Sequence, residues 1–290
     1  SFSNLTQDHL DFHQDMESYF RAKSHLFLEL PRADKVMAIN GDDPWGRRLL
    51  ELCPRALSFG LQKALPQQRH LWGELLSAGT DGCHLRMHLD GQQWELRSPL
   101  VGAFNASNLL SVQALALELG LMPDDLRHLE DFHGVCGRLE RVPNARKLHV
   151  FVDYAHTPDA LVNVLKALRG AGFKRIVTVF GCGGNRDRTK RPIMGEAVAR
   201  YSDVAVLTSD NPRFEDPEAI LKDVLPGLRE AREVVVEVDR RKATAKAVEM
   251  LGPDDALLIA GKGHEDYQII QGTKHHYSDQ EVVRELLGCA

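Results

Sequence analysis

Residues 203–213 read DVAVLTSDNPR, an apolar run that passes directly into a polar loop. The run 203–207 is typical of a buried strand, and Pro217 marks the start of the next helix. Open α/β sheets bind ligands at the carboxyl ends of their strands. At this end Asp210 can take an ammonium group and Arg213 can take a carboxylate. An Asn-Pro turn with a solvated arginine explains the same residues without any ligand.

A second strand and polar loop precede this stretch. Residues 174–180 are rich in β-branched and apolar side chains, and residues 181–192 read GCGGNRDRTKRP. The glycines allow a backbone to approach a ligand closely, and the arginines and lysine make the loop positive. A helix is expected from Pro192 to Tyr201. Glycine-rich loops are common, so the glycines alone indicate little.

Together the two loops resemble those in the C-terminal domain of the Mur ligases. Within that family the resemblance is to members that add meso-diaminopimelate, in which the Asp-Asn-Pro-Arg motif selects the amino acid; lysine-adding relatives lack the arginine. The physics agrees, because a guanidinium fork suits a distal carboxylate and repels an ammonium. The resemblance runs along nearly the whole chain. It implies an α/β fold, with part of a central ATP-binding domain at 1–141 and a Rossmann-like domain with a mostly parallel sheet at 142–290.

The composition fits a protein of one or two domains, with 290 residues, 43% hydrophobic residues and a net charge of -5. The charge gives no sign of nucleic-acid binding, and no apolar run reaches the length of about 18 residues that a membrane span needs. Five cysteines without a CxxC pair suggest reduced thiols in a cytoplasm, and the resemblance implies a bacterial one. We expect a monomer.

The chain has no G-x-x-G-K-[ST] phosphate loop, which Mur ligases carry upstream of the segment that Ser1 resembles. We therefore expect this chain to be the C-terminal piece of a longer protein. It would lack the UDP-binding domain and the phosphate loop, and would be inactive by itself.

Two residues near the start resemble the family's metal-binding positions. His9 lies in a segment similar to Asn-Leu-x-x-Asp-His-Leu-Asp, and Lys23 lies in a helix expected from Met16 to Leu30. The resemblance implies that His9 binds Mg²⁺ and that Lys23 carries a carbamate that binds it through oxygen. Burial among apolar neighbours would favour the neutral amine that carbamate formation needs. A helix-capping His9 and a surface Lys23 are the structural alternatives.

Four further residues match nucleotide-binding positions of the family. Asn105 would approach the adenine, and Arg138 would reach the γ-phosphate and stabilise charge in the transition state. Asp153 and His156 follow a strand whose end faces the nucleotide, so they are candidates for ribose or adenine contacts. Each has a simpler alternative: Asn105 can cap its helix, and Asp153 can satisfy backbone N–H groups.

The resemblance assigns meso-diaminopimelate to residues at three strand ends of the second domain. The residues are Arg186, Asp210, Asn211, Arg213, Gly261 and Glu265. Gly261 and Glu265 belong to a segment that resembles the family's Gly-Lys-Gly-His-Glu motif, whose backbone and carboxylate would meet the substrate's ammonium.

The implied reaction is ATP-dependent amide-bond formation in peptidoglycan precursor synthesis, with ATP and Mg²⁺ as cofactors. ATP would phosphorylate the γ-carboxylate of the D-glutamate in UDP-N-acetylmuramoyl-L-alanyl-D-glutamate, and the amine of meso-diaminopimelate would attack the acyl phosphate. Lys23 and Arg138 are the residues that the resemblance places in catalysis.

Three alternatives remain. The first is another ligase of the superfamily, such as a folylpolyglutamate synthetase, against which Arg213 and the Gly261 motif speak. A dinucleotide-dependent oxidoreductase is the second, but Arg186 stands where the third glycine of G-x-G-x-x-G is required. The third is a non-catalytic module that binds an amino acid.

Overall fold

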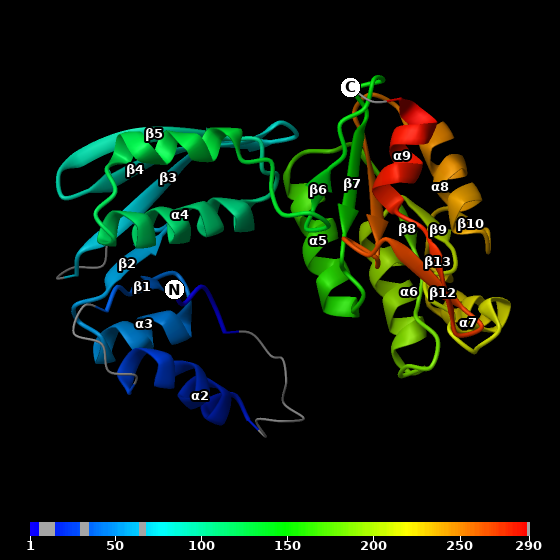
Figure 1. The fold of residues 1–290 in the computed structure, drawn as a ribbon, viewed down its shortest axis with the longest axis horizontal. Coiled ribbons are helices and arrows are strands. Elements are labelled where there is room, and N and C mark those ends of the chain that lie inside the picture. The colour runs from blue at the N-terminus through cyan, green and yellow to red at the C-terminus, as the bar shows by residue number, and fades with distance from the viewer. Residues whose placement is uncertain (6–14, 30–34, 64–67, 289–290) are drawn as a thin grey trace. The chain divides into compact units, whose positions relative to one another are not determined.

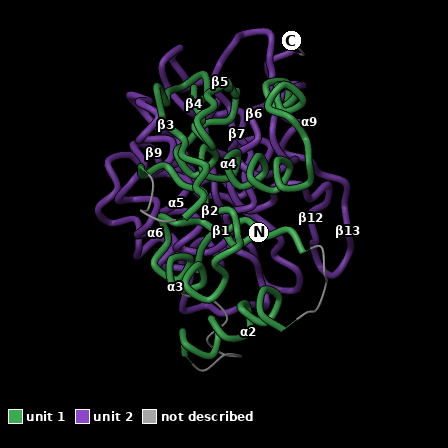
Figure 2. Tube along the Cα trace, turned by 90° about the vertical axis from the view of Figure 1, so that its left-hand side faces the viewer, with its two compact units in different colours: residues 1–132 green, residues 133–290 purple. Residues whose placement is uncertain are grey.

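The computed structural model describes residues 1–5, 15–29, 35–63 and 68–288, and the chain divides into two compact units. Unit 1 ends at Phe132 and unit 2 begins at His133 (Figure 2). The sequence analysis places this boundary nine residues later, between 141 and 142. Residues 133–141 belong with unit 2 because Glu140 and Arg141 form a strand, β6, that pairs with a strand of that unit.

Unit 1 is built on a five-stranded sheet in the order β1-β2-β3-β4-β5 (Figure 1). Its strands are β1 (Ala38–Asn40), β2 (Leu57–Gly60), β3 (His70–Gly79), β4 (Gly82–Leu89) and β5 (Gln92–Ser98). Its α-helices are α2 (Met16–Leu28), α3 (Pro44–Leu52) and α4 (Ala103–Glu118), and a 3₁₀ helix, η1, spans Pro123–Asp131. The strands β1 to β3 are parallel, whereas β4 and β5 form antiparallel pairs.

Local signals in the sequence predict several of these elements. Asp90 and Gly91 have φ angles of 52° and 80°, as a tight hairpin turn between β4 and β5 requires. The Asp43 side chain caps α3 by accepting hydrogen bonds from the N–H groups of Trp45 and Gly46, and Pro44 is at the first helical position. Asp-Gly between two alternating runs predicts the hairpin, and Asp before Pro predicts the start of α3; both predictions are confirmed.

Unit 2 is an α/β unit with a six-stranded sheet in the order β10-β9-β8-β11-β7-β6. Its strands are β6 (Glu140–Arg141), β7 (His149–Asp153), β8 (Arg175–Phe180), β9 (Val204–Leu207), β10 (Val234–Val236) and β11 (Asp255–Ala260), followed by the hairpin of β12 (Tyr267–Ile270) and β13 (Thr273–His276). The helices are α5 (Pro158–Gly170), α6 (Lys190–Tyr201), α7 (Pro217–Val224), η2 (Leu225–Leu228), α8 (Arg240–Glu249) and α9 (Asp279–Leu287). All neighbours in the six-stranded sheet are parallel except the pair β6–β7, which confirms the Rossmann-like, mostly parallel sheet.

The two faces of this sheet are covered by different helices. Alternate residues of the central strands, among them Val150, Val177 and Leu257, pack in one cluster with Ala243 of α8 and Val283 of α9. The strand residues between them point to the other face, where α5 and α6 lie side by side (Figure 1). Both faces are therefore buried, as the near-continuous apolar strands predict. No helix in the described part of the chain is long and apolar enough to cross a membrane.

A fully buried ion pair joins the starts of α8 and α9. Arg240 donates from Nε to one carboxylate oxygen of Asp279 at 2.9 Å and from Nη2 to the other at 2.8 Å. Both side chains have 0% exposure, and Nη2 also donates to the carbonyl of Ala260 at the end of β11. The pair therefore fixes two helices to a central strand end.

Replacing Arg240 with Met should lower the free energy of unfolding by about 3–5 kcal/mol, because the Asp279 carboxylate would stay buried without its partner. Urea unfolding of the 290-residue chain measures this loss. The matched control is Arg241→Met, which breaks an exposed ion pair with Glu285 between the same two helices and should cost less than about 1 kcal/mol. Equal losses in the two variants would contradict the importance of the buried pair.

Candidate functional site

Four turns of unit 2 meet at one edge of its sheet. Because β9, β8, β11 and β7 are adjacent and parallel, their carboxyl ends lie together, and residues from the turn after each strand line one pocket of about 320 Å³. The lining residues include Tyr154, His156, Gly181, Cys182, Gly183, Arg186, Asp187, Lys190, Arg191, Asp210, Asn211, Arg213, Gly261 and Glu265. All six residues expected to bind the amino acid are among them.

Glycines hold the β8 and β9 turns in backbone contact. A Cβ atom at Gly184 would lie 1.9 Å from the carbonyl oxygen of Pro212, and one at Gly181 would lie 2.4 Å from that of Thr208. The N–H of Gly184 also donates to the carbonyl of Asn211 at 2.8 Å. Close approach of a ligand is the reason that the sequence suggests for these glycines, and it stays a prediction. At 181 and 184 the backbone of the adjacent turn by itself requires glycine.

Arg213 is held from both its backbone and its side chain. Its φ angle is 54°, in a region that costs a non-glycine residue about 1 kcal/mol. The β12–β13 hairpin supports this conformation, since the Arg213 N–H donates to the carbonyl of Ile269 in β12 at 2.9 Å. The guanidinium donates from Nη1 to the Gly184 carbonyl at 2.8 Å, which uses one of its five N–H donors. Arg213 is half-buried, whereas Arg186 on the same pocket is exposed.

The acidic side of the pocket is organised around a lysine that the sequence analysis did not nominate. Lys262 is 0% exposed, and its ammonium contacts Asp210, Asn211 and Glu265. Asn211 in turn donates from Nδ2 to Glu265 Oε2 at 2.9 Å. The available signal was the place of Lys262 between two glycines directly after a buried strand.

A buried arginine, also missed from the sequence, ties the β8 turn to the segment after Arg213. Arg191 is 1% exposed and donates to both carboxylate oxygens of Glu215, at 2.9 and 3.0 Å, and to Asp223 at 2.8 Å. The pKa of Glu215 is lowered from 4.5 to about 2, mainly by the hydrogen bonds from Arg191 and next by the hydrogen bond from the Asn185 N–H. In the sequence Arg191 is one of several basic residues in a row, and nothing local distinguishes it.

The expected nucleotide residues of unit 2 lie at the end of β7 and in the segment before β6. Both carboxylate oxygens of Asp153 accept backbone N–H groups, from Leu139 at 2.6 Å and Ala155 at 2.7 Å. Burial raises the pKa of Asp153, and these hydrogen bonds oppose the rise. The backbone-satisfying role of Asp153 is therefore confirmed. His156 is exposed and lines the pocket, and its Nδ1 lies 2.8 Å from the Tyr154 carbonyl, to which it donates.

Arg138 is exposed and does not line this pocket. Its guanidinium lies over the ring of Tyr154, 5.1 Å from the centroid. The preceding Gly137 touches the Gly261–Gly263 turn, since a Cβ there would lie 2.3 Å from the Gly263 carbonyl carbon. Gly137 has a φ of 69° and accepts the Tyr154 N–H at 2.8 Å. Arg138 is thus attached to the same strand ends that form the pocket.

Asn105 belongs to unit 1, where it lies in the first turn of α4. The helix begins after Gly102, whose φ is 99°, so the alternative that Asn105 is the N-cap is wrong. Instead, Nδ2 of Asn105 donates to the Val101 carbonyl at 2.9 Å, and its Oδ1 accepts from Asn108 at 3.3 Å. The two asparagines share one face of the helix, as their spacing predicts.

The expected magnesium ligands are His9 and Lys23, of which only Lys23 belongs to the described residues. His9 lies outside the described residues, and Lys23 is exposed on α2 with its ammonium 5.1 Å from the centroid of the Tyr19 ring. Within the described parts of the chain, no three His, Cys, Asp or Glu side chains are grouped to hold a metal ion. The burial that would favour a carbamate at Lys23 is absent, and carbamylation stays a prediction.

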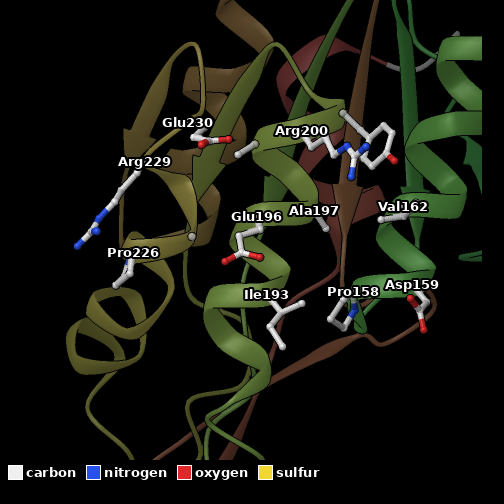
Figure 3. A pocket seen from close by; sticks show the side chains of 13 residues that line it. Pro158, Asp159, Val162, Ile193, Glu196, Ala197, Arg200, Pro226, Arg229 and Glu230 are labelled. Carbon is white, nitrogen blue, oxygen red and sulfur yellow. The ribbon is translucent and has the colours of Figure 1, made fainter.

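A larger hollow of about 790 Å³ lies elsewhere in unit 2 (Figure 3). Its walls come from α5, α6 and the η2 region, with Val162, Ile193, Glu196 and Arg229 among the lining residues. None of the described residues nominated by the sequence lines it. We therefore place the candidate site in the smaller pocket, where polar side chains from four strand ends converge.

Comparisons with known proteins give one consistent answer. Residues 1–116 match the family model described as Mur ligase middle domain, and residues 137–263 match the one described as Mur ligase, glutamate ligase domain. The UDP-N-acetylmuramoyl-L-alanyl-D-glutamate--2,6-diaminopimelate ligase of Lawsonia intracellularis is 57% identical over 289 residues, which cover 99% of this chain and 60% of that protein. The enzyme of the same name from Aquifex aeolicus is 45% identical, covering 99% and 58%.

Solved structures agree with the sequence relatives. A structure of a ligase with the same name superimposes with a TM-score of 0.72 at 34% identity, covering 98% of this chain and 58% of that one. A Mycobacterium tuberculosis folylpolyglutamate synthase complexed with ADP and AMPPCP gives 0.66 at 20% identity, covering 99% and 63%, which shows a shared fold. The chain spans about 60% of the length of the Lawsonia intracellularis relative.

The Arg191–Glu215 pair predicts how stability depends on pH. The folded-state pKa of Glu215, about 2, lies below its ordinary value of 4.5, so the pair stabilises fully above pH 4.5 and loses its contribution as the pH falls toward 2. Arg191→Met should unfold about 3 kcal/mol more easily at pH 7, because it breaks a buried pair. Between pH 4.5 and 2 its stability should fall less steeply than that of the wild type.

Urea unfolding at several pH values tests this prediction. Arg188→Met is the matched control, because Arg188 is 65% exposed and pairs with Asp223 but not with Glu215. Because Arg188 contributes less than Arg191 to the lowered pKa values of Glu215 and Asp223, the control should lose a smaller part of the wild-type acid dependence than Arg191→Met. The same acid dependence in Arg191→Met and the wild type would rule out the proposed pairing.

Proposed function

This chain belongs to the Mur ligase family, of which it comprises the middle and glutamate ligase domains, and we propose that it forms part of an ATP-dependent ligase that adds meso-diaminopimelate to UDP-N-acetylmuramoyl-L-alanyl-D-glutamate. The names of the relatives support this choice. The observation that carries the proposal is the pocket of unit 2, which combines the Arg213 guanidinium with the carboxylates of Asp210 and Glu265.

Such a pocket suits the zwitterionic end of an amino acid. The distal ammonium of meso-diaminopimelate would lie against Asp210 and Glu265, with Gly261 contributing its backbone. Its distal carboxylate would accept hydrogen bonds from Arg213 and Arg186. Charge-assisted hydrogen bonds of this kind are stronger than those between neutral groups. L-Lysine has the same ammonium but lacks the distal carboxylate, so it would leave both arginines unpaired.

The role of these residues in the reaction is orientation. ATP supplies the phosphoryl group that activates the γ-carboxylate of the D-glutamate residue. The free amine of the bound amino acid then attacks the activated carboxyl carbon, and phosphate leaves as the amide forms. Holding the amine in line with that carbon can contribute several kcal/mol, of the order of 7–11 in the most favourable intramolecular cases. The nucleotide contacts expected of Asn105, Arg138, Asp153 and His156 stay predictions.

A folylpolyglutamate synthetase activity is the second candidate, because the fold is shared. Its amino-acid substrate is a glutamate, which the Asp-Asn-Pro-Arg and Gly-Lys-Gly-His-Glu segments do not favour. A non-catalytic amino-acid-binding module is the third candidate. It would use the same pocket, so binding experiments separate it from a ligase only when combined with an assay of amide formation.

Calorimetric titration of the 290-residue chain with meso-diaminopimelate and with L-lysine tests the pocket directly. The wild type should bind the first and not the second. Arg213→Ala should weaken meso-diaminopimelate by about 10- to 100-fold, because losing charge-assisted hydrogen bonds costs about 1.5–3 kcal/mol.

The control is Arg188→Ala, which removes an exposed arginine of the same loop that does not line the pocket. It should bind like the wild type. Unchanged affinity in Arg213→Ala would exclude Arg213 as the selector. A wild type that binds neither amino acid would overturn the assignment of this pocket.

A further inference from the structure

We propose that Lys262 is the positioning residue of the amino-acid pocket. Its buried ammonium fixes Asp210, Asn211 and Glu265, and it leaves the acidic side of the pocket with a single net negative charge. This inference rests on the proposed function and deepens it, because it says which charge the pocket presents to its ligand. Lys262 does not line the pocket; it lies behind the residues that do.

The backbone around Lys262 has one narrowly defined shape. Gly261 and Gly263 have φ angles of 114° and 55°, values that residues with a Cβ rarely adopt. A Cβ at Gly263 would also lie 2.7 Å from the Cβ of Tyr154 and 2.9 Å from the carbonyl oxygen of Gly137. The turn after β11 is therefore packed on both sides, and it directs the intervening lysine into the protein.

The contacts of the ammonium match its hydrogen-bonding capacity. Nζ lies 3.4 Å from Asp210 Oδ1, 3.2 Å from Asn211 Oδ1 and 3.4 Å from Glu265 Oε2. An ammonium has three donors, and three acceptors surround it. Burying a lysine without such partners would be costly, so the cation and its acceptors depend on each other.

Lys262 also fixes the orientation of the Asn211 amide. Oδ1 of Asn211 accepts from Nζ and from the Ile269 N–H at 3.0 Å, so Nδ2 points the other way and donates to Glu265 Oε2. The two carboxylates are thus each held through one oxygen. Oδ2 of Asp210 and Oε1 of Glu265 lie outside the Lys262 contacts, and Oδ2 lies near Gly261, which lines the pocket.

The charges around Lys262 favour one class of ligand. Asp210 and Glu265 carry two negative charges, of which Lys262 offsets one. A single ligand ammonium offsets the other, while Arg213 faces the ligand carboxylate. Without Lys262, two carboxylates would face one ammonium in a low-dielectric site and would repel each other. The lysine therefore favours a ligand whose bound end carries one ammonium and one carboxylate.

The test compares Lys262→Met, which removes the charge, with Lys262→Arg, which keeps it. Calorimetric titration with meso-diaminopimelate should show at least about tenfold weaker binding by Lys262→Met and partial recovery in Lys262→Arg. A double-mutant cycle combines Lys262→Met with Glu265→Gln. The fold-loss of affinity in the double variant should be much smaller than the product of the fold-losses in the two single variants. Full affinity in folded Lys262→Met, or effects that multiply, would overturn the proposal.

A second measurement needs no ligand. Thermal unfolding should show Lys262→Met melting below the wild type and the double variant Lys262→Met/Glu265→Gln melting above Lys262→Met, because one unopposed carboxylate has been neutralised. If the double variant melts lower, the proposal is wrong. If Lys262→Met does not fold, Lys262→Gln takes its place in the same double-mutant cycle. A wild type that binds no meso-diaminopimelate would overturn the proposed function, and the unfolding cycle would still decide the role of Lys262.

Discussion

Close backbone contact between turns at one edge of the parallel sheet is the constraint on which the second unit depends. The Gly184 turn touches the Pro212 carbonyl, and Gly137 touches the Gly263 turn, at distances that leave no space for a Cβ. The first contact joins the loops after β8 and β9, and the second joins the segment before β6 to the loop after β11; the parallel order of the strands places the four loops at one edge. Side chains that are far apart in the sequence can then share one pocket, and a larger residue at either glycine would separate the loops.

Charge distribution follows from this packing. With the turns in contact, Arg191 and Lys262 are almost completely buried and have to be paired, because an unpaired buried charge is costly. Arg191 pairs with Glu215 and Asp223. Lys262 pairs with Asp210 and Glu265. The pocket is therefore lined by basic and acidic residues, which is the combination on which the proposed binding of an amino acid rests.

The two units contribute differently to what is known of the chain. Unit 2 holds a pocket lined by the turns after four of its strands and by the first turns of α6. In unit 1, Asn105 donates to the nearby Val101 carbonyl, and the Lys23 ammonium lies over the ring of Tyr19, four residues earlier. The chain spans about 60% of the length of the Lawsonia intracellularis relative, and the amino-acid binding that we propose uses residues of unit 2 alone.

The sequence by itself determined the elements and most of the candidate site. Helix caps such as Asp43 and Thr157, the hairpin turn at Asp90, and the strand ends that carry Asp210 and Glu265 all depend on residues a few positions apart, which the sequence displays. Six pocket residues could be named because their motifs resemble those of the Mur ligases and follow predicted strands. The same local reasoning offers Asn105 as a helix cap, which is wrong, because whether a helix begins at Gly102 or later depends on a backbone angle and not only on residue type.

Only the tertiary structure decided which side chains are buried together. Lys262 meets Asp210 across 52 positions of sequence, and Arg191 meets Asp223 across 32. Such pairs form because strands distant in the chain become neighbours in the sheet, so no local pattern identifies them. The tertiary structure also gave Gly181 and Gly184 their true neighbours. Burial and charge pairing depend on that spatial order, whereas caps, turns and motifs depend on the order of residues along the chain.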